Sequence, residues 1–384
     1  MCFWANYLEP SPFAPHVVTS LMRCDTIVAN RLGRAWAEIT MKAVYLTGLR
    51  EMEVREAPDP QLDGPLDVLL RVDTLGVCGS DVHYYTQGKI GPLAAPFPLL
   101  LGHELAATIL EAGAGVKTLH PGQRVAIDPL IPCGECDQCR SGRKHTCRNQ
   151  KFLGSAGQPG ALSEYLVMPA ACCSPVPDSL NDDEAAVVEP LSIGVYATQM
   201  AQLSSGARIG IVGSGPIGLC TLLAARAETD AKVYVTDLVD HRLAVARACG
   251  AAWTGNPKKE DVVASIQKLE PLGLDAVFEC AGEQEAIDQG IEMLKPGGTL
   301  LIIGIPEVDR ISFNINYIRR NELRILNVRR QNECVQPAIE LISSGRVDVG
   351  PLVTHHFRLE ETARAFEMVS SRSDGVVKAI IRIS

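Results

Sequence analysis

The sequence lacks several features that mark other classes of protein. Its longest apolar runs fall far short of the roughly 20 residues that a transmembrane helix requires. Basic residues are in deficit, with 36 Lys and Arg against 45 Asp and Glu, so the formal net charge at pH 7 is −9. An acidic chain has no electrostatic footprint for nucleic acid or for an anionic lipid surface. We therefore expect no nucleic-acid partner and no membrane partner.

The N-terminal segment lacks both the marks of a secretory signal and the period of a folded element. It has no basic start followed by a continuous apolar stretch. Residues 1–40 carry scattered prolines, so we predict a poorly ordered extension, or a chain whose biological start is Met41. A targeting peptide is the alternative, and Glu9, Asp25 and Glu38 argue against it because transit peptides are poor in acidic residues.

Cysteine, by contrast, is abundant, with 13 residues in 384. In a chain without a secretory signal, clustered cysteines favour metal or redox chemistry over disulfides, and we expect a cytoplasmic protein. Four cysteines follow the spacing C-x2-C-x2-C-x7-C, and four such thiolates suit a tetrahedral zinc ion. The predicted ligands of this structural zinc are Cys133, Cys136, Cys139 and Cys147.

Two other interpretations of this cysteine loop are weaker. A common iron–sulfur spacing is C-x2-C-x2-C-x3-C-P, whereas here the last gap is longer and Arg148 stands in place of proline. Four unligated surface thiols would oxidise readily. The loop offers no open coordination position, so we predict a structural ion.

The pattern of strand-like and helical segments changes along the sequence. Residues 41–175 contain short strand-like runs separated by Gly and Pro, which predicts an irregular, mostly antiparallel β domain. Residues 181–203 have helical spacing, with Asn181 or Asp182 as the N-cap. From Arg208 strands alternate with helices, which predicts a parallel sheet covered by helices. The tail after about residue 330 adds two helices and two strands.

A glycine-rich motif, "GSGPIG", follows a predicted strand and opens a predicted helix. This context predicts a dinucleotide-binding turn, in which the glycines allow a tight turn, close approach of a pyrophosphate and close packing of helix on sheet. The alternative is a turn that merely joins a strand to a helix. The predicted cofactor residues of the motif are Gly213, Gly215, Pro216, Ile217 and Gly218.

Two residues beyond this motif bear on the choice of cofactor. Asp237 ends the second strand, where an acidic side chain accepts hydrogen bonds from ribose hydroxyls and repels a 2′-phosphate. We therefore predict NAD rather than NADP. Arg242 stacks on adenine or, alternatively, reaches a phosphate.

A second metal site is predicted around "LGHE". Cys78 follows a strand, His103 and Glu104 follow an apolar run, and we place Glu189 at the start of an apolar helix. Cysteine, histidine and glutamate ligands with one open position are the arrangement of a catalytic zinc. Spacing alone leaves alternatives open: Cys78 as a small core residue, His103 as a hydrogen-bonded turn residue and Glu104 as a solvated charge.

Five segments in this order resemble the zinc-dependent medium-chain dehydrogenase/reductase family: "GVCGSDVHYY", "PFPLLLGHE", the four-cysteine loop, "EPLSIGVYA" and "VGSGPIGL". The resemblance covers about residues 41–384 and is greatest to sorbitol and xylitol dehydrogenases. It implies an α/β fold, in which a GroES-like β catalytic domain is split in sequence by a Rossmann domain with a doubly wound parallel sheet. We expect the catalytic domain at 41–190, the NAD-binding domain at 191–329 and the return to the catalytic domain at 330–384.

The resemblance also implies the site. Catalytic zinc binds Cys78, His103 and either Glu104 or Glu189, while Tyr84 and Arg329 lie near the substrate. The segment "NVRRQNE" around Arg329 departs from the aromatic-containing stretch expected in polyol enzymes, which puts the substrate in doubt.

The implied reaction is oxidation of a secondary alcohol of a polyol to a ketose by NAD. Ser80 and His83 are the predicted proton relay to solvent, since a histidine titrates near neutral pH. A homodimer or homotetramer is expected. The alternatives are a zinc dehydrogenase of the same fold acting on threonine, 2,3-butanediol or a sugar, and a non-catalytic NAD-binding regulator.

Overall fold

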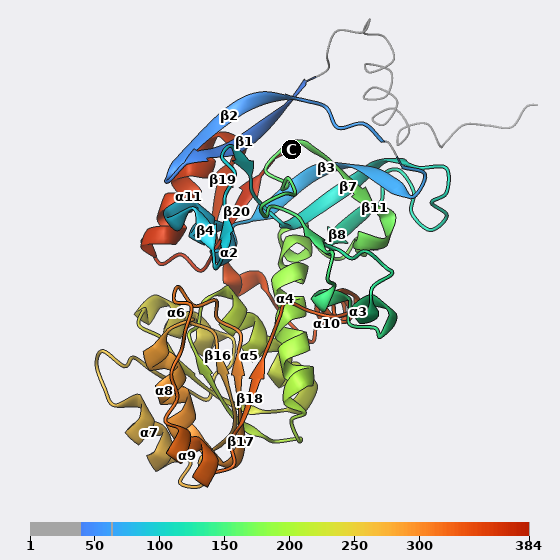
Figure 1. Cartoon of the computed structure of the whole chain (residues 1–384). Coiled ribbons are helices and arrows are strands. Elements are labelled where there is room, and N and C mark those ends of the chain that lie inside the picture. The colour runs from blue at the N-terminus through green and yellow to red at the C-terminus, as the bar shows by residue number, and fades with distance from the viewer. Residues whose placement is uncertain (1–39, 63, 384) are drawn as a thin grey trace, which may run out of the picture. The chain divides into compact units, whose positions relative to one another are not determined.

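The computed structural model describes residues 40–62 and 64–383, so the predicted extension lies outside the described residues except for its last residue, Thr40. Two large sheets organise the described chain, one of seven strands and one of six (Figure 1). No helix within the described ranges has both the length and the apolar composition that a membrane crossing requires.

The seven-stranded sheet combines the beginning and the end of the chain. Its order is β12-β8-β7-β3-β20-β19, and β11 also pairs with β3. Strand β3 is antiparallel to β7, β11 and β20, so the C-terminal strands return to the first sheet, as Figure 1 shows by their red colour beside blue β3. The strands are β3 (Asp67–Gly76), β7 (Glu104–Ala112), β8 (Arg124–Ile127), β11 (Tyr165–Pro169), β12 (Cys173–Pro175), β19 (Val353–Arg358) and β20 (Lys378–Arg382).

Smaller elements surround this sheet. A three-stranded sheet has the order β2-β1-β6, and two pairs of short strands, β4 with β5 and β9 with β10, lie in connecting segments. These strands are β1 (Thr40–Gly48), β2 (Glu51–Pro58), β4 (Lys89–Ile90), β5 (Leu93–Ala94), β6 (Leu99–Leu100), β9 (Leu130–Ile131) and β10 (Lys151–Phe152). The helices of this part are α2 (Gly79–Gln87), α3 (Asp137–Arg140) and α11 (Thr362–Ser371).

The six-stranded sheet is parallel throughout and has the order β15-β14-β13-β16-β17-β18. Its chain order reverses between β13 and β16, and ligands of such sheets bind at the carboxyl ends of the strands at this point. The strands are β13 (Arg208–Val212), β14 (Lys232–Thr236), β15 (Trp253–Gly255), β16 (Leu274–Glu279), β17 (Leu294–Ile302) and β18 (Arg324–Asn327). The accompanying helices are α5 (Pro216–Thr229), α6 (Asp240–Ala248), α7 (Val262–Leu269), α8 (Gln284–Met293) and α9 (Ile315–Arg320).

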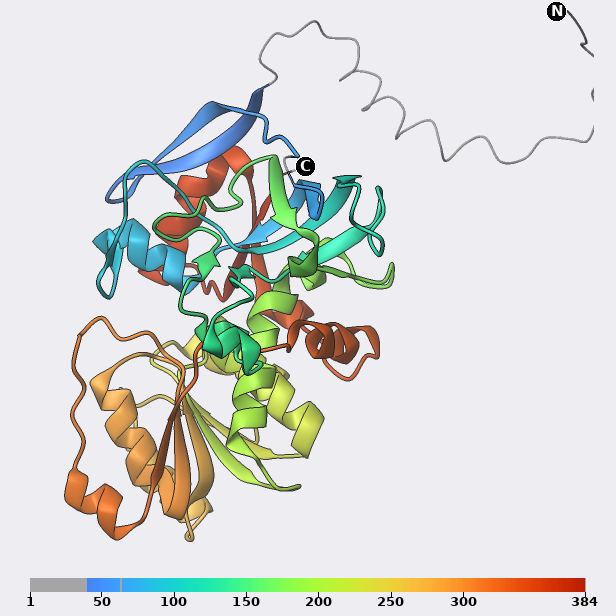
Figure 2. The same cartoon turned by 45° about the vertical axis from the view of Figure 1, so that its right-hand side comes forward.

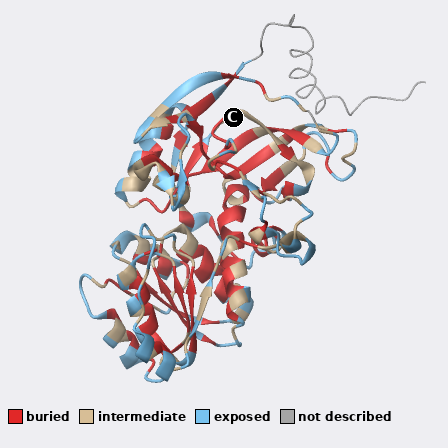
Figure 3. Ribbon diagram, viewed as in Figure 1, coloured by how far each residue is buried: buried red, intermediate tan, exposed pale blue. Residues whose placement is uncertain are grey.

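Burial explains why these segments form a parallel sheet. Strands covered on both faces need almost continuous apolar sequence, and "RIGIV" and "DAVFE" satisfy this requirement. Figure 3 shows these strands as buried ribbons between more exposed helices. The predicted antiparallel β domain and parallel sheet are both confirmed.

A long helix, α4 (Asp182–Ala201), packs against both sheets. It contacts β7 of the larger sheet and α5 beside the parallel sheet, and α10 (Val335–Ser343) packs on it as well (Figure 2). Of the two predicted N-caps, Asn181 and Asp182, Asn181 is the cap, and it forms a capping box with Glu184. The predicted domain boundary after residue 190 falls inside this continuous helix.

Candidate functional site

Three of the predicted metal ligands meet where β3, α2 and β7 adjoin. Cys78 is the N-cap of α2, His103 precedes β7 and Glu104 is the first residue of β7. The pairing of β3 with β7 places Gly76 opposite Glu104, which brings the two segments together. The ligand atoms of Cys78, His103 and Glu104 all lie within 4.8 Å of one another. The structure therefore assembles the mixed sulfur, nitrogen and oxygen donor set.

A buried carboxylate orients the histidine. The Nδ1 atom of His103 lies 3.3 Å from Oδ1 of Asp81, and both side chains are buried. A carboxylate at Nδ1 fixes the proton there and leaves the Nε2 lone pair for a metal, a common arrangement in zinc sites. The Ser80 hydroxyl lies 3.5 Å from Nε2 and donates to the Cys78 sulfur at 3.2 Å.

The charge of the donor set also fits a cation. Burial, followed by the nearby Glu104 carboxylate, raises the pKa of the Cys78 thiol, so a positive charge is needed to hold the thiolate. Glu104 Oε2 accepts a hydrogen bond of 2.5 Å from Nζ of Lys378, a lysine on β20 that is 1% exposed. The Glu104 carboxylate therefore has a buried cationic partner already.

Glu189 is placed differently from the prediction. It lies in the interior of α4, at its eighth residue, rather than at the start of a helix. Its carboxylate is buried and accepts no hydrogen bond from the described residues, and burial, opposed by the His103 charge, raises its pKa to about 8. Glu189 is not one of the three residues, Cys78, His103 and Glu104, whose donor atoms lie within 4.8 Å of one another. Unlike Glu104, it is a buried carboxylate with no hydrogen bond or ion pair from the described residues.

Replacing Asp81 with Asn is expected to weaken zinc binding by about 10–100-fold, because outer carboxylates of this kind orient a histidine ligand and increase its basicity. Zinc affinity measured by competition with a chromogenic chelator tests this. Asp73→Asn is the matched control, since Asp73 is a buried carboxylate on β3 that contacts Arg71 and Thr108. Equal affinities in both variants would show that Asp81 does not support the metal.

The four clustered cysteines are arranged for one ion. The sulfur of Cys147 lies 3.4 Å from that of Cys133 and 3.9 Å from that of Cys136, and Cys136 lies 3.6 Å from Cys139. Zinc–sulfur bonds of about 2.3 Å in a tetrahedron place the sulfurs about 3.8 Å apart. Backbone N–H groups of Arg148 and Cys139 lower the pKa of Cys136 to about 6, which favours its thiolate.

The glycine-rich motif forms the turn that its sequence predicts. Gly213 has φ 98°, and a Cβ at Gly218 would lie 1.9 Å from the Gly213 carbonyl oxygen. Gly215 is the N-cap of α5, Pro216 is its first residue and Ile217 its second. A Cβ at Gly215 would meet only Nη1 of Arg242 within 4 Å, at 3.6 Å, so this helix end is open to a pyrophosphate.

Asp237 follows β14 and lies against this turn. Its Oδ2 accepts from the Ser214 N–H at 2.6 Å and its Oδ1 accepts from the Val239 N–H at 2.8 Å. The Arg242 guanidinium lies beside the same loop, and burial lowers its pKa. The predicted acidic residue and arginine thus lie together at the carboxyl end of the sheet.

Of the residues predicted to act in catalysis, some lie close to the metal ligands and others do not. Ser80 adjoins the metal ligands, while His83 lines a narrow cleft with Lys89 and Glu307. Tyr84 is buried, and its hydroxyl accepts from the Ala156 N–H at 3.5 Å.

Arg329 is not brought to the donor group by any contact in the described structure. Its side chain is exposed, and its Nε donates to the His145 carbonyl in the cysteine loop at 3.2 Å. Its substrate role stays a prediction.

Four residues around the site were not predicted: Asp81, Phe152, Arg330 and Lys378. Lys378 had a signal, since a lysine interrupts the apolar strand "VVKAIIRI". Asp81 had a weaker one, an acidic residue three positions after a metal ligand. Phe152 and Arg330 had none, because their proximity depends on the tertiary fold.

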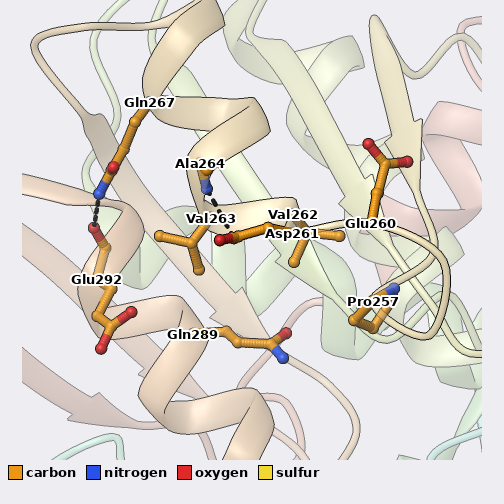
Figure 4. Close-up of a pocket in the computed structure, with 9 residues that line it drawn as sticks. All are labelled: Pro257, Glu260, Asp261, Val262, Val263, Ala264, Gln267, Gln289 and Glu292. Carbon is orange, nitrogen blue, oxygen red and sulfur yellow. Dashed lines mark hydrogen bonds between the residues drawn. The ribbon is translucent and has the colours of Figure 1, made fainter.

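A depression between α7 and α8 lies apart from these residues (Figure 4). Its Asp261 carboxylate accepts from the Ala264 N–H as a helix cap, and Gln267 donates to the Glu292 carbonyl. These polar groups stabilise the helices, and nothing in the depression resembles the donor sets above.

Comparison with known proteins agrees with this geometry. Residues 64–178 match the alcohol dehydrogenase GroES-like domain, and residues 216–344 match the zinc-binding dehydrogenase domain. Sorbitol dehydrogenase of Bacillus subtilis is 35% identical over 342 residues, which cover 89% of this chain and 97% of the relative. L-idonate 5-dehydrogenase of Vitis vinifera is 33% identical over 348 residues, covering 89% of this chain and 94% of the relative.

A solved structure is also similar throughout. A zinc-binding dehydrogenase from Sinorhizobium meliloti, crystallised with NADP, is 31% identical with a TM-score of 0.82, and the match covers 90% of this chain and 99% of that one.

Proposed function

The chain belongs to the zinc-dependent medium-chain dehydrogenase/reductase family, and from this premise we propose that it oxidises a secondary hydroxyl of a polyol to a ketose. In the balanced reaction the alcohol and NAD+ give the ketone, NADH and one proton. The observation that supports this most strongly is the buried group of Cys78, His103 and Glu104, with Asp81 behind the histidine.

Zinc, when bound by Cys78, His103 and either Glu189 or Glu104, would make an alcohol hydroxyl more acidic, and NAD would supply the hydride acceptor. The chain's own residues then have to position the substrate and remove a proton. The Ser80 hydroxyl lies between the Cys78 sulfur and the His103 ring, so it is placed to accept the proton of a substrate hydroxyl there. His83, one turn further along α2 and lining the cleft, is the proposed path to solvent.

His83 should give activity a distinct pH dependence. Burial lowers its pKa below 6.5, with Glu307 acting in the opposite direction, so the neutral, proton-accepting form persists to lower pH. We expect the acidic limb of kcat/KM for alcohol oxidation to lie below about pH 6.5. His83→Asn should remove this limb and lower the rate about 10²-fold or more. An unchanged pH profile in the variant would remove His83 from the relay.

The cofactor proposal rests on Asp237, whose carboxylate would bind ribose hydroxyls and repel a 2′-phosphate. NAD should be preferred over NADP by at least about tenfold in kcat/KM, since a hydrogen bond to a charged group contributes about 1.5–3 kcal/mol. Asp237→Ser should shrink this ratio, mainly by weakening NAD. It also removes the bond to the Ser214 N–H, so the ratio of the two cofactors is the informative quantity. Equal efficiency of the unmodified enzyme with NADP, through Arg242, would contradict the assignment.

A substrate panel tests the reaction itself. Sorbitol, xylitol, threonine, 2,3-butanediol and free sugars should be assayed with NAD, and a polyol should give the highest kcat/KM. Higher efficiency with threonine or the diol would favour the other dehydrogenases of this fold. NAD binding without turnover of any alcohol would favour a regulator, although the complete donor set argues against one.

We propose further that the enzyme works in the cytoplasm as a homodimer or homotetramer. The cysteine cluster supports the compartment, because ligand thiols must stay reduced. Light scattering of the purified protein would give the mass of the assembly.

A further inference from the structure

A buried carboxylate at the end of β16 has no part in the mechanism proposed above. Glu279 is the last residue of β16 and is 0% exposed. Its Oε1 accepts hydrogen bonds from the N–H groups of Ala281 at 2.7 Å and Gly282 at 2.6 Å. Its Oε2 has no hydrogen-bond partner among the described residues. The side chain therefore holds the loop that follows its own strand through one oxygen.

The backbone of Glu279 holds the neighbouring loop as well. Its carbonyl oxygen accepts from the N–H groups of Ile303 at 2.8 Å and Gly304 at 3.0 Å, the two residues that follow β17. The two loops touch through their backbones, because a Cβ at Gly282 would lie 2.5 Å from the Ile305 carbonyl oxygen. Glu279 thus joins the loop after β16 to the loop after β17.

These two loops lie between the places that the cofactor has to connect. On one side, a Cβ at Gly213 of the glycine-rich turn would lie 3.0 Å from the Ala281 nitrogen. On the other side, Ile305 lines the same cleft as His83, which belongs to the helix that Cys78 caps. The pyrophosphate would bind at the turn and the hydride would move near the metal ligands, so the nicotinamide has to pass the two loops.

We propose that Glu279 is a positioning residue for the nicotinamide half of the cofactor, because its hydrogen bonds fix the loop 280–282 against which the ring lies. A displacement of about 1 Å in a reacting group can lower a rate about 10²-fold. The inference rests on the proposed function, since it requires a nicotinamide cofactor.

The role belongs to the acceptor oxygen of Glu279 rather than to its charge. Burial raises the pKa of this carboxyl group, while the N–H groups of Gly282 and Ala281 act in the opposite direction. No cationic side chain forms an ion pair with it among the described residues, and the loop N–H groups need only an acceptor. An uncharged amide oxygen at the same place should therefore serve as well.

Binding of two ligands to the purified enzyme tests the proposal: NADH, and ADP-ribose, which lacks the nicotinamide. Glu279→Leu removes the acceptor and keeps a side chain of similar size. Calorimetric titration should show at least about tenfold weaker binding of NADH, as expected when buried N–H groups lose their partner, and less than about threefold weaker binding of ADP-ribose. In the same variant kcat for polyol oxidation should fall by about 10²-fold.

Two conservative variants of the same residue separate this role from folding. Glu279→Gln keeps an acceptor oxygen for both N–H groups, so NADH affinity and kcat should stay within about threefold of the unmodified enzyme. Glu279→Asp withdraws the oxygens by one methylene and should weaken NADH selectively, as Glu279→Leu does. If Glu279→Leu does not fold, the titrations of Glu279→Asp decide.

Glu270→Leu is the matched control. Glu270 is also a buried carboxylate, but it accepts from Lys232 at the start of β14, at the opposite end of the parallel sheet. This variant should leave the ratio of NADH to ADP-ribose affinity unchanged, even where its melting temperature falls.

The outcomes distinguish this inference from the proposed function. Equal weakening of NADH and ADP-ribose in the Glu279 variants, or no weakening of either, would overturn the positioning role and leave the dehydrogenase intact. A loss of NADH affinity of more than tenfold in Glu279→Gln would overturn the role of the acceptor oxygen. Failure of the unmodified enzyme to bind NADH would contradict the proposed function itself.

Discussion

Glu189→Gln is expected to remove the catalytic zinc and lower activity by more than about 100-fold, an effect larger than the loss of an outer partner of a ligand. Glu189 is buried in α4 without a hydrogen bond to its carboxylate from the described residues, so a metal ion is the partner that would compensate its charge. Burial raises the pKa of Glu189 to about 8, so at neutral pH the carboxyl of the metal-free protein is mostly protonated and uncharged, and the free energy of unfolding of the metal-free Glu189→Gln protein should stay about the same.

Glu104→Gln should instead keep the zinc and lower the free energy of unfolding. It leaves the Lys378 ammonium, which is 1% exposed, without its carboxylate partner at 2.5 Å. Breaking a buried ion pair in this way typically destabilises by about 3–5 kcal/mol. Zinc content and denaturant unfolding of both variants provide the measurement. We propose Glu189 as the direct zinc ligand and Glu104 as the partner of Lys378. Loss of zinc from Glu104→Gln together with its retention in Glu189→Gln would contradict this.

Cys139→Ser should release the second zinc and destabilise the enzyme. The loop supplies all four ligands of the structural ion, and the catalytic ion is bound elsewhere by three other ligands. Zinc content should therefore fall from about two ions per chain to about one. The binding free energy of a structural ion contributes directly to folding, and for small zinc domains it is on the order of 10 kcal/mol. We therefore expect a clear drop in melting temperature.

Cys249→Ser is the matched control, since this buried cysteine ends α6 outside the cluster. It should keep both zinc ions. A Cys139→Ser protein that retained its zinc and its melting temperature would contradict the structural role of the loop.

Local sequence was sufficient to predict the two sheets. The parallel sheet followed from apolar strands alternating with helices, and the antiparallel sheet from short runs between turns. The boundaries were harder. The segment "KPGG" is typical of a turn, yet residues 294–302 form a single strand, β17. The pairing of β17 with β16 continues across this segment with a shift in register. The helix predicted at 181–203 matches α4, but the placement of Glu189 at a helix start was wrong, since Glu189 and Pro190 lie inside α4.

The inner site was predictable only where it is encoded in short motifs. Cys78 and His103 stand in such motifs, and the fold brings them together. The cationic partner of Glu104 comes from a distant segment, because Lys378 lies 274 positions further along the chain. Arg330 meets Phe152 in the same manner. A single sequence does not specify which distant charges will pair, because this depends on strand order and register.

Oxidation of polyols with NAD at a zinc site is tested most directly by NADH formation. One preparation should be assayed with neutral and acidic polyols as purified, after zinc removal and after zinc is restored. We predict turnover with at least one polyol, its loss in the metal-free protein and its recovery with zinc. Full activity without metal, or no NADH from any alcohol by the zinc-loaded protein, would contradict it.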